Sequence, residues 1–177
     1  MDLDTIKSQM ESAGVSDLFG TKKEVKALPG ILNDDEHIVY ATSGIVNNNT
    51  VLVVLTQKRV IFIDKGLIYG IKSTEIPLDM VNGVSYSKGI LLGKVSITNG
   101  SITTAIDNVD KNTAPVLTDK IKETAEQYKE SLRTPVKNTP IQVLDGPDQI
   151  KKYKSLEDEG IITHEEFEAK KKQIMGI

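Results

Sequence analysis

The stretch VLVVLTQKRVIFID, residues 51–64, predicts a β-hairpin. Two runs of β-branched and other apolar residues, 51–55 and 60–63, flank a short polar joint, as is typical of two strands joined by a tight turn. If Gln57 and Lys58 form the turn, Leu55 lies opposite Val60, and the pairs further along the strands follow in step. The position of the turn therefore predicts the register.

Both faces of this hairpin are apolar, whereas a hairpin with one face in water alternates apolar and polar residues. The first face can line a β core and consists of Val53, Leu55, Val60 and Phe62. The second face needs a cover of its own and consists of Leu52, Val54, Ile61 and Ile63. That cover is either an N-terminal helix carrying Leu3, Ile6 and Met10 or a partner chain. We therefore treat the second face as a candidate interaction surface.

The composition is that of an ordinary globular protein, since 38% of the 177 residues are hydrophobic and 27% are charged. A net charge of −3 argues against nucleic acid as a partner, because nucleic-acid binders carry a basic face or arm. The absence of cysteine excludes thiol catalysis, thiolate metal sites and disulfides. The N-terminal residues lack the apolar core of a signal peptide, and no run is long enough to span a membrane. We expect a cytoplasmic location, with association with a membrane surface as an open alternative.

The order of the remaining patterns predicts an α+β fold. A helical apolar spacing occupies residues 2–13, and Thr21 and Glu24 have the spacing of a capping box that opens a short second helix. Strand patterns follow near residues 37–45, 50–56, 59–64, 67–77, 82–87, 91–98 and 101–107, and an amphipathic helix near 113–132. Seven strands and a closing helix predict a bent antiparallel sheet or barrel with the helix over one open end.

The C-terminal residues predict a helical hairpin after a linker. Residues 133–146 contain two prolines and predict the linker, and residues 147–177 predict the hairpin. Gly160 ends the first helix, Thr163 and Glu166 form a capping box, and Ile162 and Phe167 form a hydrophobic staple. We expect Tyr153, Leu156, Ile162 and Phe167 to form its packing surface. So short a hairpin cannot bury a stable core alone, so it must pack on the main domain, on a second copy of itself or on a partner.

Two parts of the chain resemble known families. The segments LTQKRVIFID and EIPLDMVNGVSYSKGILLGKVSI resemble the bacterial pleckstrin-homology-like (PH-like) domains, in particular the YokE-like group. The segment IKKYKSLEDEGIITHEEFEAKKKQIMGI resembles the short C-terminal (SHOCT) domain, in which a helix, Gly-Ile-Ile-Thr, Glu-Glu-Phe and a lysine-rich end follow one another. The resemblance implies a seven-stranded PH-like fold with a C-terminal helix. It divides the chain into an N-terminal helical segment (1–30), a PH-like domain (31–132), a linker (133–146) and a SHOCT hairpin (147–177).

The resemblance implies no catalytic residues. Eukaryotic PH domains that bind phosphoinositides carry Lys and Arg on their first two strands and the loop between them. The corresponding stretch here, TSGIVNNNTV at residues 42–51, has no basic residue, so we do not expect stereospecific binding of inositol phosphates.

The residues themselves also fail to suggest an enzyme. His37 and His164 are the two histidines, and neither has a partner at the spacing of a metal or catalytic motif. We expect no enzyme activity, cofactor or metal. A different candidate is the basic set Lys58, Arg59, Lys65 and Lys72, which would contact lipid phosphates or an acidic partner if the four converge. The alternative, which we prefer, is that Lys58 is an exposed turn residue and Arg59 pairs locally.

Residues Ile90, Leu91 and Leu92 beside Gly89 have two interpretations. They form either an exposed insertion loop or, as we prefer, the start of a buried strand.

These features predict a non-enzymatic PH-like scaffold that associates with itself or with another protein, through the second hairpin face and the helical tail. The alternative is a peripheral membrane adaptor that binds anionic lipid through the Lys58–Arg59 tip. A third hypothesis, a phage-borne regulatory factor, rests only on where such domains tend to be encoded.

Overall fold

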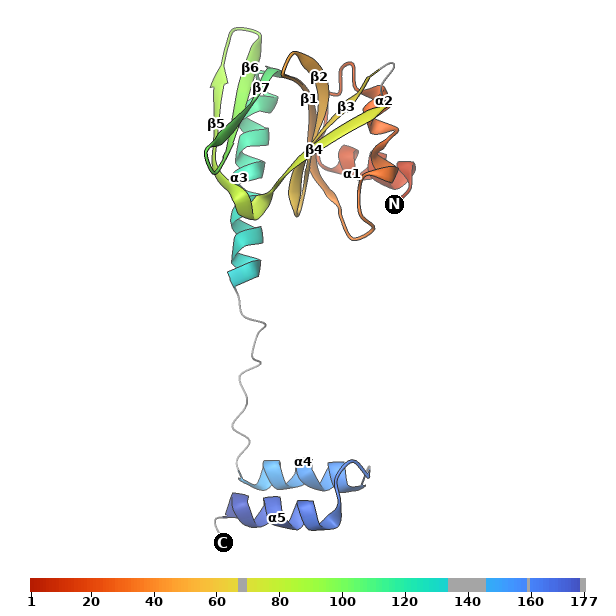
Figure 1. Ribbon diagram of the computed structural model, residues 1–177, viewed down its shortest axis with the longest axis vertical. Coiled ribbons are helices and arrows are strands. Elements are labelled where there is room, and N and C mark those ends of the chain that lie inside the picture. Colours follow the sequence, from red (N-terminus) through yellow and green to blue (C-terminus); the bar gives the residue numbers. More distant parts are fainter. Residues whose placement is uncertain (67–69, 134–145, 159, 176–177) are drawn as a thin grey trace. The chain divides into compact units, whose positions relative to one another are not determined.

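The computed structural model describes residues 1–66, 70–133, 146–158 and 160–175. The chain divides into two compact units, residues 1–133 and residues 134–177, and each is described here by itself (Figure 1). Residues 1–30 belong to the same compact unit as the sheet. The predicted linker falls largely on residues 134–145, which lie outside the described residues.

The first unit is an open, seven-stranded antiparallel sheet in the order β4-β3-β2-β1-β7-β6-β5, so β4 and β5 are its edges. The predicted seven strands and the closing helix are confirmed; the first three residues of the predicted strand 67–77 lie outside the described residues. The strands are β1 (Ile38–Val46), β2 (Asn49–Thr56), β3 (Arg59–Lys65), β4 (Ile71–Pro77), β5 (Val81–Lys88), β6 (Leu92–Asn99) and β7 (Ile102–Asp110). The helices are α1 (Leu3–Ser12), α2 (Lys22–Val25) and α3 (Thr113–Arg133), with 3₁₀ turns η1 (Leu28–Gly30) and η2 (Leu78–Met80).

The β2–β3 hairpin has the predicted register. Leu55 pairs with Val60, Val54 with Ile61, Val53 with Phe62 and Leu52 with Ile63. The preceding β1–β2 turn contains Asn47 and Asn48 with φ of 50° and 65°. Asparagine tolerates this left-handed conformation better than most residues, and a two-residue turn that has it at both positions matches the twist of the strands.

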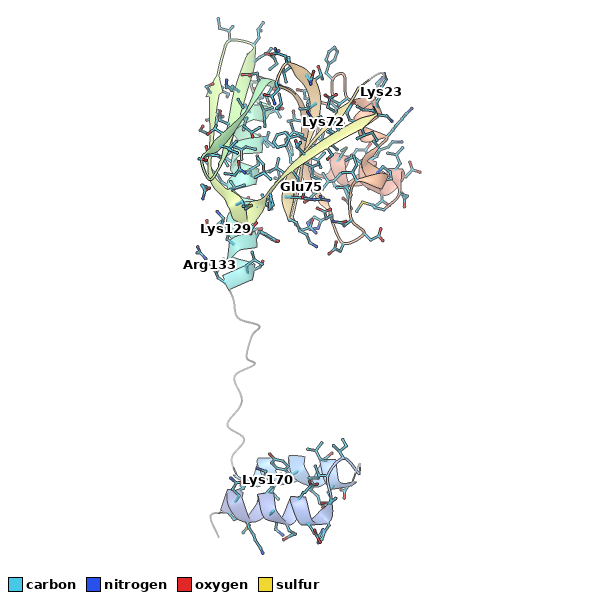
Figure 2. All side chains as sticks on the ribbon, in the orientation of Figure 1. Lys23, Lys72, Glu75, Lys129, Arg133 and Lys170 are labelled. Atoms are coloured by element: carbon cyan, nitrogen blue, oxygen red, sulfur yellow. The ribbon has the colours of Figure 1, made fainter. Side chains whose placement is uncertain are left out.

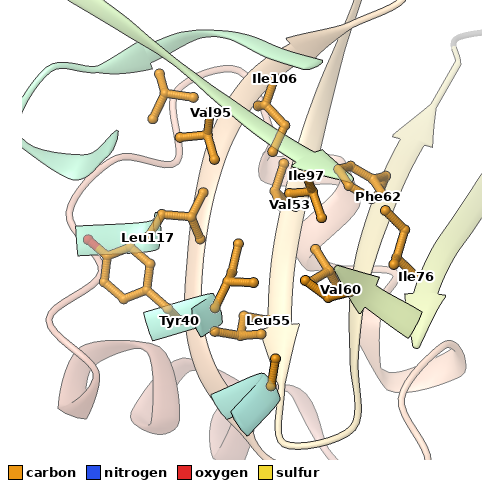
Figure 3. Close-up of a cluster of buried hydrophobic side chains, with 14 of the residues drawn as sticks. Tyr40, Val53, Leu55, Val60, Phe62, Ile76, Val95, Ile97, Ile106 and Leu117 are labelled. Carbon is orange, nitrogen blue, oxygen red and sulfur yellow. The ribbon is translucent and has the colours of Figure 1, made fainter. Parts of the chain in front are cut away.

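The first hairpin face lines the main core, as predicted. Its side chains pack with Tyr40 of β1, with inward residues of β5 to β7 and with α3 (Figure 3). Leu117 and Ile121, one helical turn apart on α3, are fully buried in this core. Helix α3 therefore covers the inner side of the bent sheet, which is the role predicted for the closing helix.

The sheet bends sharply between β1 and β7, which pair at Ile45 and Asp107 alone. Gly44 makes this close approach possible, because a Cβ atom at that position would lie 2.4 Å from Cγ2 of Ile106. A side chain at Gly44 would push the two halves of the sheet apart.

The second unit contains α4 (Gly146–Asp158) and α5 (His164–Met175), which form an antiparallel hairpin (Figure 1). Gly160 has a φ of +73°, and the Ile161 N–H donates to the Leu156 carbonyl at 2.9 Å. This is the glycine stop that the sequence predicted after the first helix.

Candidate functional site

The second hairpin face is covered from within the chain. Its four side chains, Leu52, Val54, Ile61 and Ile63, are all fully buried. They pack against apolar side chains of the N-terminal segment, among which Ile6 and Met10 of α1 and Leu28 of η1 are buried as well. Of the two covers that the sequence left open, the structure has the N-terminal helix. The prediction that this face is open to a partner is corrected accordingly.

The four basic residues proposed as a patch do not converge. Lys58 and Arg59 lie at the β2–β3 turn, whereas Lys65 ends β3 and Lys72 pairs with Asp64 near that end. Lys65 lies six positions along β3 from Arg59, which corresponds to about 20 Å. The prediction of one basic cluster is therefore wrong, and the patch divides into two places.

Arg59 is held by carboxylates of its own chain. Its Nη2 lies 2.6 Å from Oε2 of Glu36 and its Nε lies 2.8 Å from Oε1, while Nη1 binds Glu75. The Glu36 side chain is fully buried, and burial alone would raise its pKa. Hydrogen bonds from Arg59, from the Asn33 N–H and from the Thr56 hydroxyl outweigh that effect and lower the pKa of Glu36 to about 2.

Lys58 is likewise paired, with the exposed carboxylate of Asp35. Both cations at this turn are thus neutralised by neighbours from the segment before β1, as the preferred interpretation held for Arg59. The two ion pairs hold the residues before β1 against the β2–β3 turn. The turn therefore presents no net positive charge to a lipid phosphate.

The capping box predicted at Thr21 and Glu24 does not form. The Thr21 hydroxyl donates to the Leu18 carbonyl at 2.9 Å, and Oε1 of Glu24 accepts from the Lys65 N–H at 3.0 Å. Tertiary contact has replaced local capping, because Glu24 is buried against β3 and joins α2 to the sheet.

Within the described ranges, the side chains form no group of three or more His, Asp or Glu that would hold a metal ion. Nδ1 of His164 lies 2.7 Å from Oε1 of Glu157, which ties the end of α4 to the start of α5. No described helix is long and apolar enough to cross a membrane.

The tail hairpin packs around Phe167. Among the tail residues whose side chains are described, Phe167 alone is buried, while Tyr153, Leu156 and Ile162 are half-buried. The ammonium groups of Lys154 and Lys171 lie 5.5 and 5.7 Å from the centre of its ring. The predicted capping box is present, since the Thr163 N–H donates to Glu166 at 2.9 Å and the Glu166 N–H donates to the Thr163 hydroxyl at 3.3 Å.

A surface that the sequence analysis placed wrongly lies at the β5–β6 turn. We call Ile90, Leu91 and Leu92 the apolar tip. Their exposed fractions are 91%, 74% and 47%, so they do not start a buried strand. The ladder between β5 and β6 ends at Lys88 and Gly93, so residues 89–91 project beyond it. The alternative interpretation, an exposed loop, is correct for Ile90 and Leu91, whereas Leu92 is the exposed first residue of β6.

An exposed aromatic residue lines the same pocket as Leu92 of the apolar tip. Phe19, in the loop between α1 and α2, is 88% exposed. Phe19 and Leu92 both line a pocket of about 650 Å³ beside the β1–β7 corner. Its remaining lining residues are Ser16, Asp17, Ser43, Gly44, Ile45, Thr50, Asn108 and Asp110. We call the apolar tip, Phe19, this pocket and the adjoining turns 47–48 and 111–112 the loop end of the first unit.

Lysines surround the loop end. Lys22, Lys23 and Lys65 line a second pocket of about 690 Å³, which also contains Phe19. Nζ of Lys111 donates to the Ile90 carbonyl at 3.2 Å, and Lys88 is the last residue of β5 before the tip. Figure 2 shows Lys23 and Lys72 toward this end of the unit, and Lys129 and Arg133 of α3 toward the other.

The chain is similar to known bacterial domains over both units. The family model described as a bacterial PH domain matches residues 32–123, and the one described as a short C-terminal domain (SHOCT) matches residues 148–175. Both matches confirm the resemblance found in the sequence.

Two solved structures show the same kind of similarity. A DUF1696-family protein with a pleckstrin-homology domain from Shewanella loihica PV-4 is 16% identical with a TM-score of 0.41, over 62% of this chain and 93% of that one. A pleckstrin-homology domain from Shewanella amazonensis SB2B is 20% identical with a TM-score of 0.40, over 64% of this chain and 91% of that one. No protein with a curated description matches the sequence.

Proposed function

Because the chain belongs to the bacterial PH domain family, we propose that it is a non-enzymatic interaction module whose SHOCT hairpin joins two copies of the chain. The observation that carries this proposal is the small core of the hairpin. Of its described side chains, Phe167 alone is buried, while Tyr153, Leu156 and Ile162 keep part of their apolar surface in water. Two helices with so little buried surface are not stable by themselves. A second layer of helices would supply the missing burial.

The charges of the hairpin favour a second copy as that layer. The end of α4 and the start of α5 are acidic, with Glu157, Asp158, Glu165, Glu166 and Glu168. The other end of α5 is basic, with Lys170, Lys171 and Lys172, of which Lys171 pairs with Glu168 of its own helix. Two identical hairpins related by a twofold axis can pair in opposite directions, which places each acidic end against a basic end. The hairpin is thus electrostatically complementary to itself.

The first test measures mass. Light scattering of the full chain at high micromolar concentration should give a dimer, and residues 1–133 should give a monomer. Ile150→Asp, which introduces a charge on the half-buried side of α4, should also give a monomer of the full chain.

A charge exchange tests the orientation of the two hairpins. Lys170→Glu with Lys172→Glu should abolish the dimer, and so should Glu165→Lys with Glu168→Lys, because each change sets like charges against each other. Mixing the two variants should restore a dimer containing one of each. A full chain that stays monomeric throughout would refute self-association, and would leave another protein as the partner of the hairpin.

A further inference from the structure

Among the described residues of the first unit, the loop end carries the most exposed apolar side chains. Ile90 is 91% exposed, Phe19 88% and Leu91 74%, and they come from two loops far apart in the sequence. Such side chains in water are unfavourable, and a group of them at one place marks a binding surface. We propose that the loop end docks on the surface of an anionic lipid bilayer, with Ile90, Leu91 and Phe19 inserted at the level of the headgroups.

The shape of the surface fits a bilayer. Phe19 and Leu92 line the same pocket, whose other lining residues include the polar Ser16, Ser43 and Asn108. A folded protein partner needs a surface that matches the apolar tip, Phe19 and the pocket together, whereas a fluid bilayer adapts to each of them separately. Amphipathic surfaces of this kind bind at the boundary between headgroups and acyl chains.

The backbone of the tip suits this environment. The Ile90 carbonyl accepts from Nζ of Lys111 at 3.2 Å, and the Leu92 carbonyl accepts from the Gly89 N–H at 2.8 Å. Removing water from a carbonyl that already accepts a hydrogen bond costs less free energy than removing it from a carbonyl without one. The ammonium group of Lys111 also lies at the tip, where it would meet the phosphate layer.

The distribution of charge favours the same orientation. Lys22, Lys23, Lys65 and Lys88 have exposed or half-buried side chains, and no carboxylate of the described residues forms an ion pair with any of them. Four carboxylates, Asp17, Glu24, Asp64 and Asp110, lie at the same end. Of these, Asp110 accepts from the Asn112 and Thr113 N–H groups, and Asp17 accepts from the Ser43 hydroxyl. With Lys111 the lysines outnumber these carboxylates, so the loop end is positive on a chain whose net charge is −3.

The opposite end of β2 carries Asp34, Asp35 and Glu36, about 20 Å from Thr50 at the loop end, and these carboxylates pair with the N-terminal ammonium group, Lys58 and Arg59. An anionic surface therefore attracts the loop end more strongly than the opposite end, where cations and carboxylates pair with one another. The docking site differs from the Lys58–Arg59 tip of the sequence-based alternative, and it does not require self-association of the tail.

The test is sedimentation of the full chain with vesicles of phosphatidylglycerol and phosphatidylcholine in equal parts, and with vesicles of phosphatidylcholine alone. We expect binding to the anionic vesicles that weakens at high ionic strength. Ile90→Ser combined with Leu91→Ser should lower the partition coefficient about tenfold or more, because two inserted apolar side chains are lost. The matched control is Ile102→Ser, since Ile102 is 63% exposed on the unit but lies at the β6–β7 turn.

Charge is tested separately. Lys22→Glu with Lys23→Glu should weaken binding to anionic vesicles, whereas Lys122→Glu on the exposed side of α3 should leave it unchanged. Absence of binding to anionic vesicles at low ionic strength would overturn the proposal. Unchanged binding of the Ile90→Ser, Leu91→Ser variant to anionic vesicles would overturn it as well. So would the finding that the apolar tip binds a protein instead of the vesicles. Each readout is independent of the mass of the chain, so failure here and failure of tail dimerisation are separate results.

Discussion

Replacing Arg59 by Met leaves Glu36 buried without its cation. The Glu36 side chain has no exposed surface and that of Arg59 is 17% exposed, so water cannot substitute for the lost guanidinium. Removing one partner of a buried ion pair typically costs about 3–5 kcal/mol. Lowering the pKa of Glu36 from an ordinary 4.5 to about 2 corresponds to about 3 kcal/mol, which Arg59 supplies together with the Asn33 N–H and the Thr56 hydroxyl. We expect a loss of about 3 kcal/mol in the free energy of unfolding at pH 7.

The pH dependence follows from the direction of this change. Because the pKa of Glu36 is lower in the folded state, the unfolded state takes up the proton first as the solution becomes acidic. The stabilisation is complete above pH 4.5 and is lost as the pH falls toward about 2. Without Arg59, burial keeps the pKa high and this contribution is absent. The difference between the natural protein and Arg59→Met should therefore shrink between pH 7 and about pH 3.

The assay is urea unfolding followed by far-ultraviolet circular dichroism. A loss of about 3 kcal/mol lowers the midpoint by about 1.5 M when the urea dependence is about 2 kcal/mol per molar. The matched control is Lys58→Met, which removes the neighbouring cation from the exposed Asp35 and should change the midpoint little. Equal effects of the two substitutions, or an Arg59→Met effect of the same size at both pH values, would refute this account of Glu36.

Three further predictions concern the covered face, the bend of the sheet and the tail. Ile6→Ala should lower the free energy of unfolding in urea by about 2–5 kcal/mol, because Ile6 is fully buried against the second hairpin face. Leu3 is half-buried, so Leu3→Ala should cost clearly less. Equal losses would contradict the covering role of α1. Gly44→Ala should lower stability by about 1–3 kcal/mol in thermal unfolding, because its Cβ would lie 2.4 Å from Ile106. The control Gly83→Ala, with 4.0 Å to the nearest side chain, should lack this clash. An unchanged unfolding midpoint for Gly44→Ala would show that β1 and β7 can move apart at little cost. Thr163→Ala should destabilise α5 by about 1 kcal/mol, seen as lower helical content on heating, and Thr163→Ser should retain most of the cap; identical curves for the two would exclude a role of the hydroxyl.

The sequence predicted the parts of the fold that depend on near neighbours. The pairing of Leu55 with Val60 follows from a two-residue turn, and a period of two then assigns every side chain of the hairpin to a face. The stop at Gly160 and the capping box at Thr163 are likewise complete within a few residues.

The parts that were wrong depend on distant segments. Leu91 and Leu92 are residues typical of a buried strand, but the pairing of β5 with β6 ends at Lys88 and Gly93. The identity of the two leucines does not determine where that pairing ends. Thr21 and Glu24 have capping-box spacing, but Glu24 turns to the Lys65 N–H, because β3 lies against α2. A local pattern predicts what a residue can do, and a competing tertiary partner changes the outcome.

The same division applies to the candidate site. The sequence by itself determined that the β2–β3 hairpin has two apolar faces, because alternation along a strand is a local property. Only the tertiary structure decided that α1 covers the second face and that Glu36 neutralises Arg59. It also decided that Phe19 and the apolar tip share one end with several lysines. Burial and electrostatic environment depend on which remote segments meet, and that is settled when the chain packs as a whole.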